Sequence, residues 1–226
     1  MLIPVVFQNN DFVVIDKPAD IGVHSEESAG LVVQLKQQLN VPNLYPVHRL
    51  DKMTSGLMVF ALNKPTAQAF QKAFENHEVE KFYLAISDQK PKKKQGWVKG
   101  DMLTARRGSW KLAKTMQNPA RTQFISTLLQ PSERLFLLKP LTGKTHQIRV
   151  AMKSLSAPIC GDIRYAFADL AKLEDRGYLH AYAMRFELFS RSYEFVSLPN
   201  TGKRFVTEDC KLALLAWSKP WECFNS

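Results

Sequence analysis

The order of strand-like and helix-like segments is the feature that most constrains the fold of this chain. Short runs rich in β-branched and aromatic residues, typical of strands, lie at 12–15, 57–62, 81–86, 122–129 and 135–139. Apolar residues at helical spacing predict helices over 29–39 and from Pro65 onward. The two kinds of segment do not alternate regularly, so we expect an α+β fold with a mixed, largely antiparallel sheet and flanking helices.

Weaker signals come from the second half of the chain. Between 95 and 119 the regular spacing of apolar residues weakens, and Gly, Arg, Trp and Lys are frequent. The segments 184–189 and 193–198 look like the two strands of a hairpin. Thr145 is expected to cap a short helix from His146 to about residue 154.

The C-terminal part, 200–226, is expected to be a helical extension. Thr207 should cap its helix, with Leu212, Leu215 and Ala216 facing inward. Because the chain has no internal repeat and no low-complexity linker, we expect a single domain over residues 1–226.

The charge balance predicts a polyanionic partner. There are 31 Lys and Arg against 21 Asp and Glu, a formal net charge of +10. Such an excess favours binding to nucleic acid, because neutralising phosphates releases counterions.

The cysteines and the N-terminus bear on the cellular compartment. Cys160, Cys210 and Cys223 are scattered, so they suggest neither a disulfide framework nor a zinc site. The N-terminus has no basic segment typical of a signal peptide, and no apolar run is long enough to span a membrane. We expect a cytoplasmic protein without a metal.

One dense polar motif lies at His48-Arg49-Leu50-Asp51-Lys52-Met53-Thr54-Ser55-Gly56-Leu57, just before a buried strand candidate. Asp51 stands between two cations, Arg49 and Lys52. A charged surface loop is the plain interpretation. The alternative is a site that holds an ionised acid beside a polyanion, and it requires partners for Asp51 elsewhere in the chain.

A second dense motif, Leu141-Thr142-Gly143-Lys144-Thr145-His146-Gln147-Ile148-Arg149, supplies a possible partner. It is not a nucleotide-binding P-loop, because that motif needs a glycine where this chain has Leu138. Arg149 lies between apolar neighbours, and a buried guanidinium there needs a carboxylate. Asp51 is a natural candidate, and the pair would keep Asp51 ionised.

Several blocks together resemble the RluA-type pseudouridine synthases. Besides the two motifs above, the matching blocks are Asp16-Lys17-Pro18 with Gly22 and His24, then Lys81, Tyr83 and Ala85, then Pro158–Asp162 with Tyr165, and Leu179-His180-Ala181. The resemblance covers about residues 7–199. Each block alone is weak, but their common order makes the match specific. Lys144 departs from the family, which usually has arginine there, and this change loses bidentate geometry.

The resemblance implies a pseudouridine-synthase-like fold with a central active-site cleft, and an enzyme that isomerises uridines in RNA without a cofactor. By resemblance Asp51 is the catalytic aspartate, Tyr83 lies against the target base, and Arg149 pairs with the aspartate. A carboxylate suits this chemistry, because the ribose develops positive character when the bond to uracil breaks. Each residue also has a plain structural alternative. Asp51 could be a turn residue, Tyr83 a strand tyrosine with a solvated hydroxyl, and Arg149 part of a core salt bridge without a catalytic role.

The remaining candidates are residues expected to bind RNA or the target uridine. Arg49 is placed like a family arginine that fills the gap left by the flipped nucleotide, and Ile148 would line the uracil pocket. The other candidates are His48, Thr54, Lys144, His146, Gln147, Arg106 and Arg107. The alternatives stay open: a phosphate contact or a surface position for Arg49, a hydrogen-bonded structural histidine at least as much as a ligand for His48, and core packing for Ile148. For Arg106 and Arg107 the alternative is a solvated loop.

Two other functions compete with a synthase: an inactive RNA-binding or chaperone module on the same fold, and a glycosidase that stops after bond cleavage. Because the chain begins almost at its first family motif, we expect it to lack the S4-type RNA-binding domain that many relatives carry. The expected partner is a stem-loop of ribosomal or transfer RNA, with no obligate protein partner and a monomer as the simplest state. The sequence leaves open which uridine is modified, and whether Asp51 attacks C1′ or removes a ribose proton.

Overall fold

The computed structural model describes residues 2–23 and 30–224 of the chain. The chain forms two compact units, which are described separately. The first contains the residues up to Glu80 together with Ala181–Leu198, and the second contains Lys81–His180 and the residues from Pro199 onward. Each unit combines strands and helices, so the predicted α+β class is confirmed. The single domain and the central cleft concern both units together and stay predictions.

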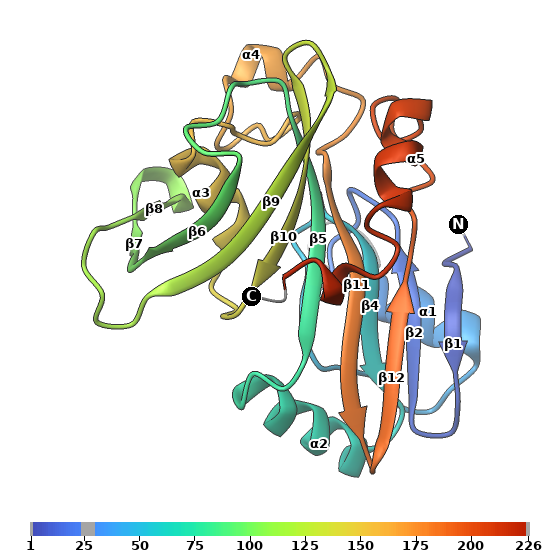
Figure 1. Ribbon diagram of the computed structural model, residues 1–226. Coiled ribbons are helices and arrows are strands. Elements are labelled where there is room, and N and C mark those ends of the chain that lie inside the picture. The colour runs from blue at the N-terminus through green and yellow to red at the C-terminus, as the bar shows by residue number, and fades with distance from the viewer. Residues whose placement is uncertain (1, 24–29, 225–226) are drawn as a thin grey trace. The chain divides into compact units, whose positions relative to one another are not determined.

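The first unit is an antiparallel sheet with two helices. Its elements are β1 (Val5–Gln8), β2 (Phe12–Lys17), α1 (Leu31–Leu39), β3 (Tyr45–Pro46), β4 (Ser55–Ala61), α2 (Lys64–Glu75), most of β11 (Leu179–Leu188) and β12 (Arg191–Val196). The strand order is β1-β2-β4-β11, with β12 paired to β11 (Figure 1). In addition, β3 pairs with β4. The predicted hairpin is therefore β11–β12. Residue 29, the expected first residue of α1, lies outside the described residues.

The core of the first unit is an aromatic cluster between α2 and the sheet. The ring of Phe12 lies 5.6 Å from that of Phe70 and 5.0 Å from that of Tyr193. Every residue of β4 is buried, as its apolar run predicts. Asn63 caps α2 by accepting a hydrogen bond from the Thr66 N–H, with a proline in the first turn. This packing fixes the start of β4, where the first polar motif ends.

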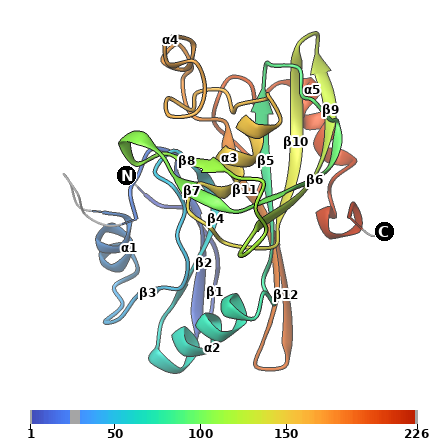
Figure 2. The same cartoon turned by 90° about the vertical axis from the view of Figure 1, so that its left-hand side faces the viewer.

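In its described residues, the second unit has a four-stranded sheet, a small hairpin, three α-helices and two 3₁₀ helices, Arg106–Gly108 and Pro220–Glu222. Its elements are β5 (Glu80–Ser87), β6 (Gln95–Gly100), β7 (Met102–Thr104), β8 (Trp110–Leu112), β9 (Ala120–Gln130), β10 (Glu133–Pro140), α3 (Gln147–Ser154), α4 (Ala168–Ala171) and α5 (Glu208–Leu215). The order β5-β10-β9-β6 is antiparallel, and β7 pairs with β8 (Figure 2). No helix of the described part is long and apolar enough to cross a membrane.

Two expectations for this unit need correction. The weakly patterned segment 95–119 contains β6, β7 and β8, which are short and partly exposed and therefore lack a clear apolar period. Thr207 does cap α5, but Leu212 and Leu215 are 63% and 71% exposed. The inward row of α5 contains Cys210 and Leu214, so the predicted face was wrong.

Candidate active site

Asp51 lies in a tight turn directly before β4. The carbonyl oxygen of Asp51 accepts a hydrogen bond of 3.0 Å from the Thr54 N–H. The Asp51 side chain is half-buried, whereas Arg49 and Lys52 on either side are exposed. Thr54 is buried, which favours a structural role in the turn over contact with RNA. The turn therefore separates one partly sheltered carboxylate from two cations that face solvent.

Lys17, from the first matching block, holds this turn in place. Its side chain is fully buried, and its ammonium donates to the carbonyl oxygens of Pro18, Ile21 and Lys52 at 2.8, 2.9 and 3.2 Å. A buried ammonium is costly unless its donors are satisfied, and these three carbonyls satisfy all three. Lys17 thus ties the end of β2 to the residue after Asp51.

His48 has a framing position as well. Its Nε2 accepts a hydrogen bond of 3.0 Å from the Val59 N–H of β4, and its ring lies 5.1 Å from that of Phe74. Because a backbone N–H can only donate, Nε2 carries no proton in this arrangement. The geometry favours the structural alternative for His48.

Gly56 shows why the motif needs a glycine at the start of β4. Its φ is +105°, and a Cβ atom there would lie 2.3 Å from the carbonyl oxygen of Ala181. Any larger residue would push β4 away from β11 and disturb the turn that carries Asp51.

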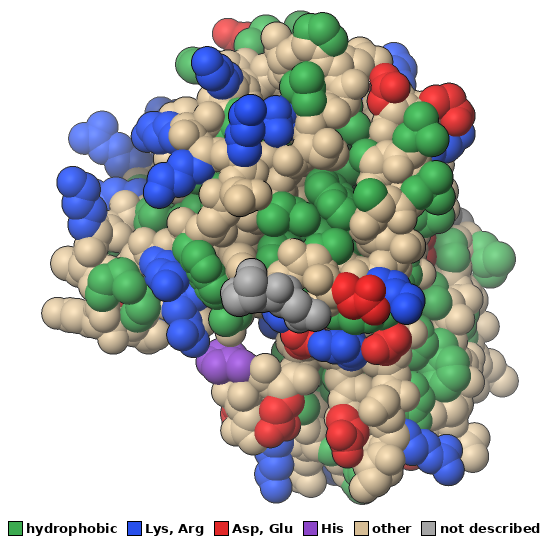
Figure 3. All heavy atoms as spheres, in the orientation of Figure 1, with side chains coloured by type: hydrophobic (Ala, Val, Ile, Leu, Met, Phe, Trp, Pro, Cys, Tyr) green, Lys and Arg blue, Asp and Glu red, His purple; other side chains and the backbone are tan. Residues whose placement is uncertain are grey.

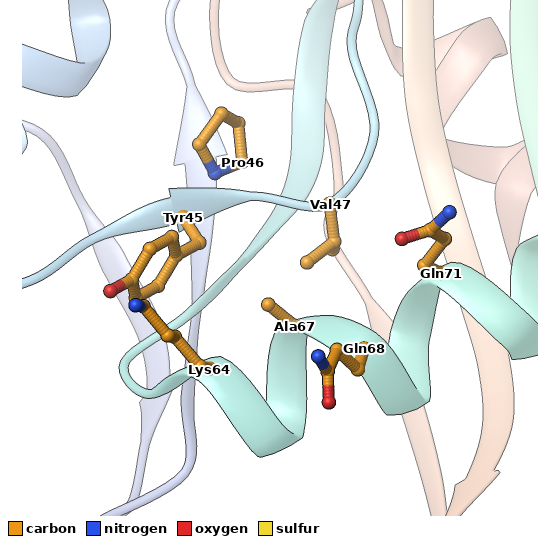
Figure 4. Close-up of a pocket in the computed structure, with 7 residues that line it drawn as sticks. All are labelled: Tyr45, Pro46, Val47, Lys64, Ala67, Gln68 and Gln71. Atoms are coloured by element: carbon orange, nitrogen blue, oxygen red, sulfur yellow. The ribbon is translucent and has the colours of Figure 1, made fainter.

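A depression of about 430 Å³ lies between β3 and α2 in the same unit. Figure 4 shows Val47 pointing toward Ala67, and the ring of Tyr45 beside the Lys64 side chain. Two carboxamides, those of Gln68 and Gln71, complete its polar lining. It contains none of the predicted site residues.

Tyr83 lies on β5 in the second unit, opposite Leu138 of β10. It is half-buried, and alternation along the strand places it on the other face from Phe82. Phe82 packs on the C-terminal tail, with its ring 6.0 Å from that of Phe224. Burial lowers the pKa of Lys81, two residues before Tyr83.

The second motif surrounds the start of α3. The helix begins at Gln147, and its N-cap is His146 in a left-handed conformation (φ 56°), so the predicted cap at Thr145 was wrong. The Gln147 amide closes the loop before the helix, and its oxygen accepts from the Thr142 hydroxyl and the Lys144 N–H.

The Gln147 nitrogen donates to the carbonyl oxygen of Arg121 and to the Thr122 hydroxyl. With two bonds accepted and two donated, the amide is saturated inside the protein. This geometry does not support the predicted contact between Gln147 and RNA.

Arg149 is buried on α3 and has a carboxylate partner within its own unit. Its Nε and Nη2 donate to the two oxygens of Asp162, both at 2.8 Å, and the side chains are 8% and 0% exposed. Such a two-pronged ion pair fixes the plane of the guanidinium. The predicted pairing of Arg149 with Asp51 involves a residue of the other unit and stays a prediction.

Cationic side chains gather on the part of the second unit that carries β6 to β9 (Figure 3). Arg106 and Arg107 are exposed in the loop between β7 and β8. Lys144 is half-buried and donates to the Asn118 side chain at 3.0 Å. Ile148 is buried on α3.

Asp88, Cys160 and Glu174 form the single group in the described part of the chain whose ligand atoms are close enough to share a metal ion. Arg204 already donates to both carboxylate oxygens of Glu174, at 3.0 and 2.6 Å. Burial raises the pKa of Cys160 to about 12, which disfavours the thiolate that a metal requires. We assign no metal to this group.

Comparison with known proteins identifies the family. Residues 11–154 match the family model described as RNA pseudouridylate synthase. This chain belongs to the RNA pseudouridylate synthase family. The chain is also 49% identical to an uncharacterized RNA pseudouridine synthase of Haemophilus influenzae, over 91% of this chain and 92% of that protein.

Two further comparisons agree with this assignment. The tRNA pseudouridine synthase C of Haemophilus ducreyi is 32% identical, with 73% of this chain and 74% of that protein covered. Human RNA pseudouridylate synthase domain containing 1 has the same fold, with a TM-score of 0.76 at 22% identity, covering 96% of this chain and 95% of that one. The RluA-type resemblance, the fold class and the isomerase activity on RNA are thereby confirmed.

Three residues that organise the site were not among the sequence candidates: Lys17, Asp162 and Tyr165. All three lie in the blocks that carried the family resemblance. Their presence in these blocks was the only sign in the sequence that they matter for the site. Their partners are far away in the sequence, so no local pattern indicated what they contact.

Proposed function

We propose that this RNA pseudouridine synthase modifies a uridine in a stem-loop of transfer or ribosomal RNA, with Asp51, Tyr83 and Arg149 as its catalytic residues. The observation that carries the proposal is the Asp51 turn, which presents a half-buried carboxylate on a rigid frame made by Lys17 and His48. A catalytic carboxylate needs this combination of a fixed position and access to the substrate.

The isomerisation makes one bond and breaks another without a change in mass. The N1–C1′ bond of the uridine breaks, C5 of the uracil bonds to C1′, and the proton on C5 is lost while N1 gains one. Asp51 stabilises or traps the sugar while C1′ carries positive character. Direct attack on C1′ and removal of a ribose proton are both compatible with this role.

Arg149 and Tyr83 have complementary roles in the proposal. The guanidinium of Arg149 favours the ionised form of a neighbouring carboxylate, which would keep Asp51 charged. The ring of Tyr83 stacks on the flipped uracil, an interaction worth about 1–3 kcal/mol per base, and its hydroxyl is a candidate for proton transfer at C5.

RNA contacts outside the uridine come mainly from cationic side chains. Arg49 fills the place of the flipped nucleotide, and Arg106, Arg107 and Lys144 contact phosphates. His146 contacts the same strand, and Ile148 lines the uracil pocket. We leave His48, Thr54 and Gln147 out of the RNA contacts, because their geometry serves the protein frame.

The target class follows from charge and from a relative. A net charge of +10 suits a folded RNA. A relative is named for its action on tRNA, and we carry that class over to this chain as one of the two candidate targets. We further propose a cytoplasmic monomer that acts without a cofactor.

Release of tritium from RNA labelled at C5 of uridine tests the proposal. We expect release with the wild-type protein and total RNA from cells that lack the gene, and none with Asp51→Ala. Activity that survives in Asp51→Ala would overturn the assignment of Asp51. Free uracil among the products would instead indicate a glycosidase, and binding without any release would indicate an RNA-binding module.

A further inference from the structure

The segment Gly161-Asp162-Ile163-Arg164-Tyr165, called the 161–165 segment below, matches the family but has no assigned role. Its shape is fixed by Gly161, which has a φ of +75° and whose Cβ would lie 2.0 Å from the carbonyl oxygen of Arg176. The Tyr165 N–H then donates to the carbonyl oxygen of Asp162 at 3.2 Å, which closes a turn. The turn directs two polar side chains, Asp162 and Tyr165, toward α3.

Asp162 is fully buried and all of its partners are polar. Besides the two bonds from Arg149, one of its oxygens accepts from the backbone N–H groups of Arg164 and Tyr165, at 3.0 and 3.2 Å. A buried carboxylate with this many donors is held rigidly. It therefore fixes the direction in which the guanidinium of Arg149 points.

Tyr165 contacts two residues of the second motif, His146 and Arg149. Its ring lies 5.0 Å from the guanidinium carbon of Arg149, and its hydroxyl lies 2.9 Å from Nδ1 of His146. The same hydroxyl accepts a bond of 2.9 Å from the Trp110 N–H of β8. Because a backbone N–H can only donate, the hydroxyl accepts that bond and keeps its own proton available for Nδ1 of His146. When the hydroxyl donates to Nδ1, a neutral His146 carries its own proton on Nε2.

The 161–165 segment also holds the loop that carries Arg106 and Arg107. Arg164 donates through Nη1 to the carbonyl oxygen of Arg107, and Tyr165 bonds to the N–H of Trp110. The middle of this exposed basic loop and its β8 end are thus joined to the 161–165 segment.

We propose that Asp162 and Tyr165 are positioning residues for the isomerisation: Asp162 orients Arg149, while Tyr165 sets the tautomer of His146 and ties the β7–β8 loop to α3. The inference rests on the proposed roles of Arg149 and His146 in the synthase reaction. Burial raises the pKa of Tyr165, in keeping with a hydroxyl that remains a donor at neutral pH.

Tyr165→Phe tests the tyrosine with little change in packing, because only the hydroxyl is removed. With total RNA labelled at C5 of uridine, we expect kcat to fall about tenfold, which corresponds to the free energy of a single buried hydrogen bond. Tyr178→Phe is the matched control, since it removes a buried hydroxyl that bonds to Asp175 and to the Arg204 N–H in the same unit. The control should keep the wild-type kcat.

Nitrogen NMR of the His146 ring gives a readout that does not depend on activity. In the wild type we expect protonated Nε2 and an accepting Nδ1, and in Tyr165→Phe a mixture of tautomers. A wild-type ring protonated on Nδ1, or an unchanged ring in Tyr165→Phe, would overturn the proposed role of Tyr165.

Asp162→Asn tests the aspartate. We expect kcat to fall roughly 100-fold, as for a misplaced catalytic group, and we expect the same change to add little in an Arg149→Met background. If Asp162→Asn lowered kcat by the same factor in the wild type and in Arg149→Met, Asp162 would not act through Arg149. If Asp162→Asn fails to fold, Asp162→Glu, which keeps the charge, is used in the same pair of backgrounds. Absence of release by the wild type would refute the proposed activity itself, separately from this inference.

Discussion

The two polar motifs of this synthase are held in different ways. In the Asp51 turn, the framing bonds run between side chains and backbone: Lys17 holds carbonyl oxygens and His48 accepts from a strand N–H. In α3, the framing bond is an ion pair between two buried side chains, Arg149 and Asp162. In each motif some polar side chains bond within the protein, among them His48 and Gln147, while others such as Arg49 are exposed to solvent.

This difference predicts how each motif responds to mutation. The frame of the Asp51 turn is made by Lys17 and His48, whereas the frame of α3 depends on the charge of Arg149 itself. Changes at Asp51 should therefore lower activity far more than stability, and changes at Arg149 should lower activity and stability together.

Asp51→Asn should have the largest effect on the reaction. Loss of an essential group of this kind lowers kcat by at least about 10⁴-fold, while the midpoint of thermal unfolding should stay at the wild-type value. Tritium release and thermal unfolding on the same preparation provide the comparison. A fall in the unfolding temperature of Asp51→Asn as large as that of Arg149→Met would mean that the two motifs respond to mutation in the same way.

Arg149→Met should lower kcat by at least about 100-fold while leaving measurable activity. It should also cost about 3–5 kcal/mol in the free energy of unfolding, because it leaves a buried carboxylate without its partner. Arg185→Met is the matched control, since Arg185 is 39% exposed beside Glu80 and such a pair is worth about 0–1 kcal/mol. Denaturant unfolding measures both. Similar costs for the two variants would show that the α3 ion pair contributes little to stability.

Lys17→Met should loosen the Asp51 turn from its backbone side. Three carbonyl groups lose the charged donor that Lys17 supplies, at a cost of about 1–3 kcal/mol. The value of kcat should fall because the turn no longer fixes Asp51. Hydrogen exchange at the Thr54 amide reports on the turn directly. Unchanged exchange together with full activity would mean that Lys17 is not part of the frame.

Arg106→Ala should weaken RNA binding several-fold and leave kcat unchanged. The slope of log K against log salt should drop by about one, as for the loss of one phosphate contact. Filter binding with total RNA at several salt concentrations measures it. A fall in kcat with no change in the salt slope would place Arg106 in the reaction rather than on the RNA backbone.

The smallest expected effect is a loss of stability at alkaline pH, which we attribute to the buried thiol of Cys160. Burial raises the pKa of Cys160, next to the 161–165 segment, to about 12. In the unfolded chain this thiol ionises near pH 9, so stability is unaffected below that pH and is lost as pH rises from about 9 toward 12. Cys160→Ala should flatten the decline in unfolding free energy between pH 9 and pH 10.5. An unchanged decline would mean that the thiol is not responsible.

Local patterns predicted the elements of this fold well where packing follows the chain. The run 57–62 gave β4, Pro65 marked the first turn of α2, and Thr207 caps α5. The strands in 95–119 were missed, because half-exposed strands need no alternation of apolar residues.

The candidate site was predicted less completely, because its frame depends on distant contacts. The need of Arg149 for a carboxylate was clear from its apolar neighbours, but Asp162 was not proposed as a partner. Gln147 looked like a ligand residue because an exposed amide and a saturated buried amide cannot be told apart in a sequence.

Mapping pseudouridines in cells that lack the gene tests the central claim most directly. One or a few positions in transfer or ribosomal RNA should lose pseudouridine, and expression of the wild-type protein should restore them. Expression of Asp51→Asn at the same protein level should restore none. Restoration of the same positions by Asp51→Asn would contradict the claim that the Asp51 turn carries the chemistry.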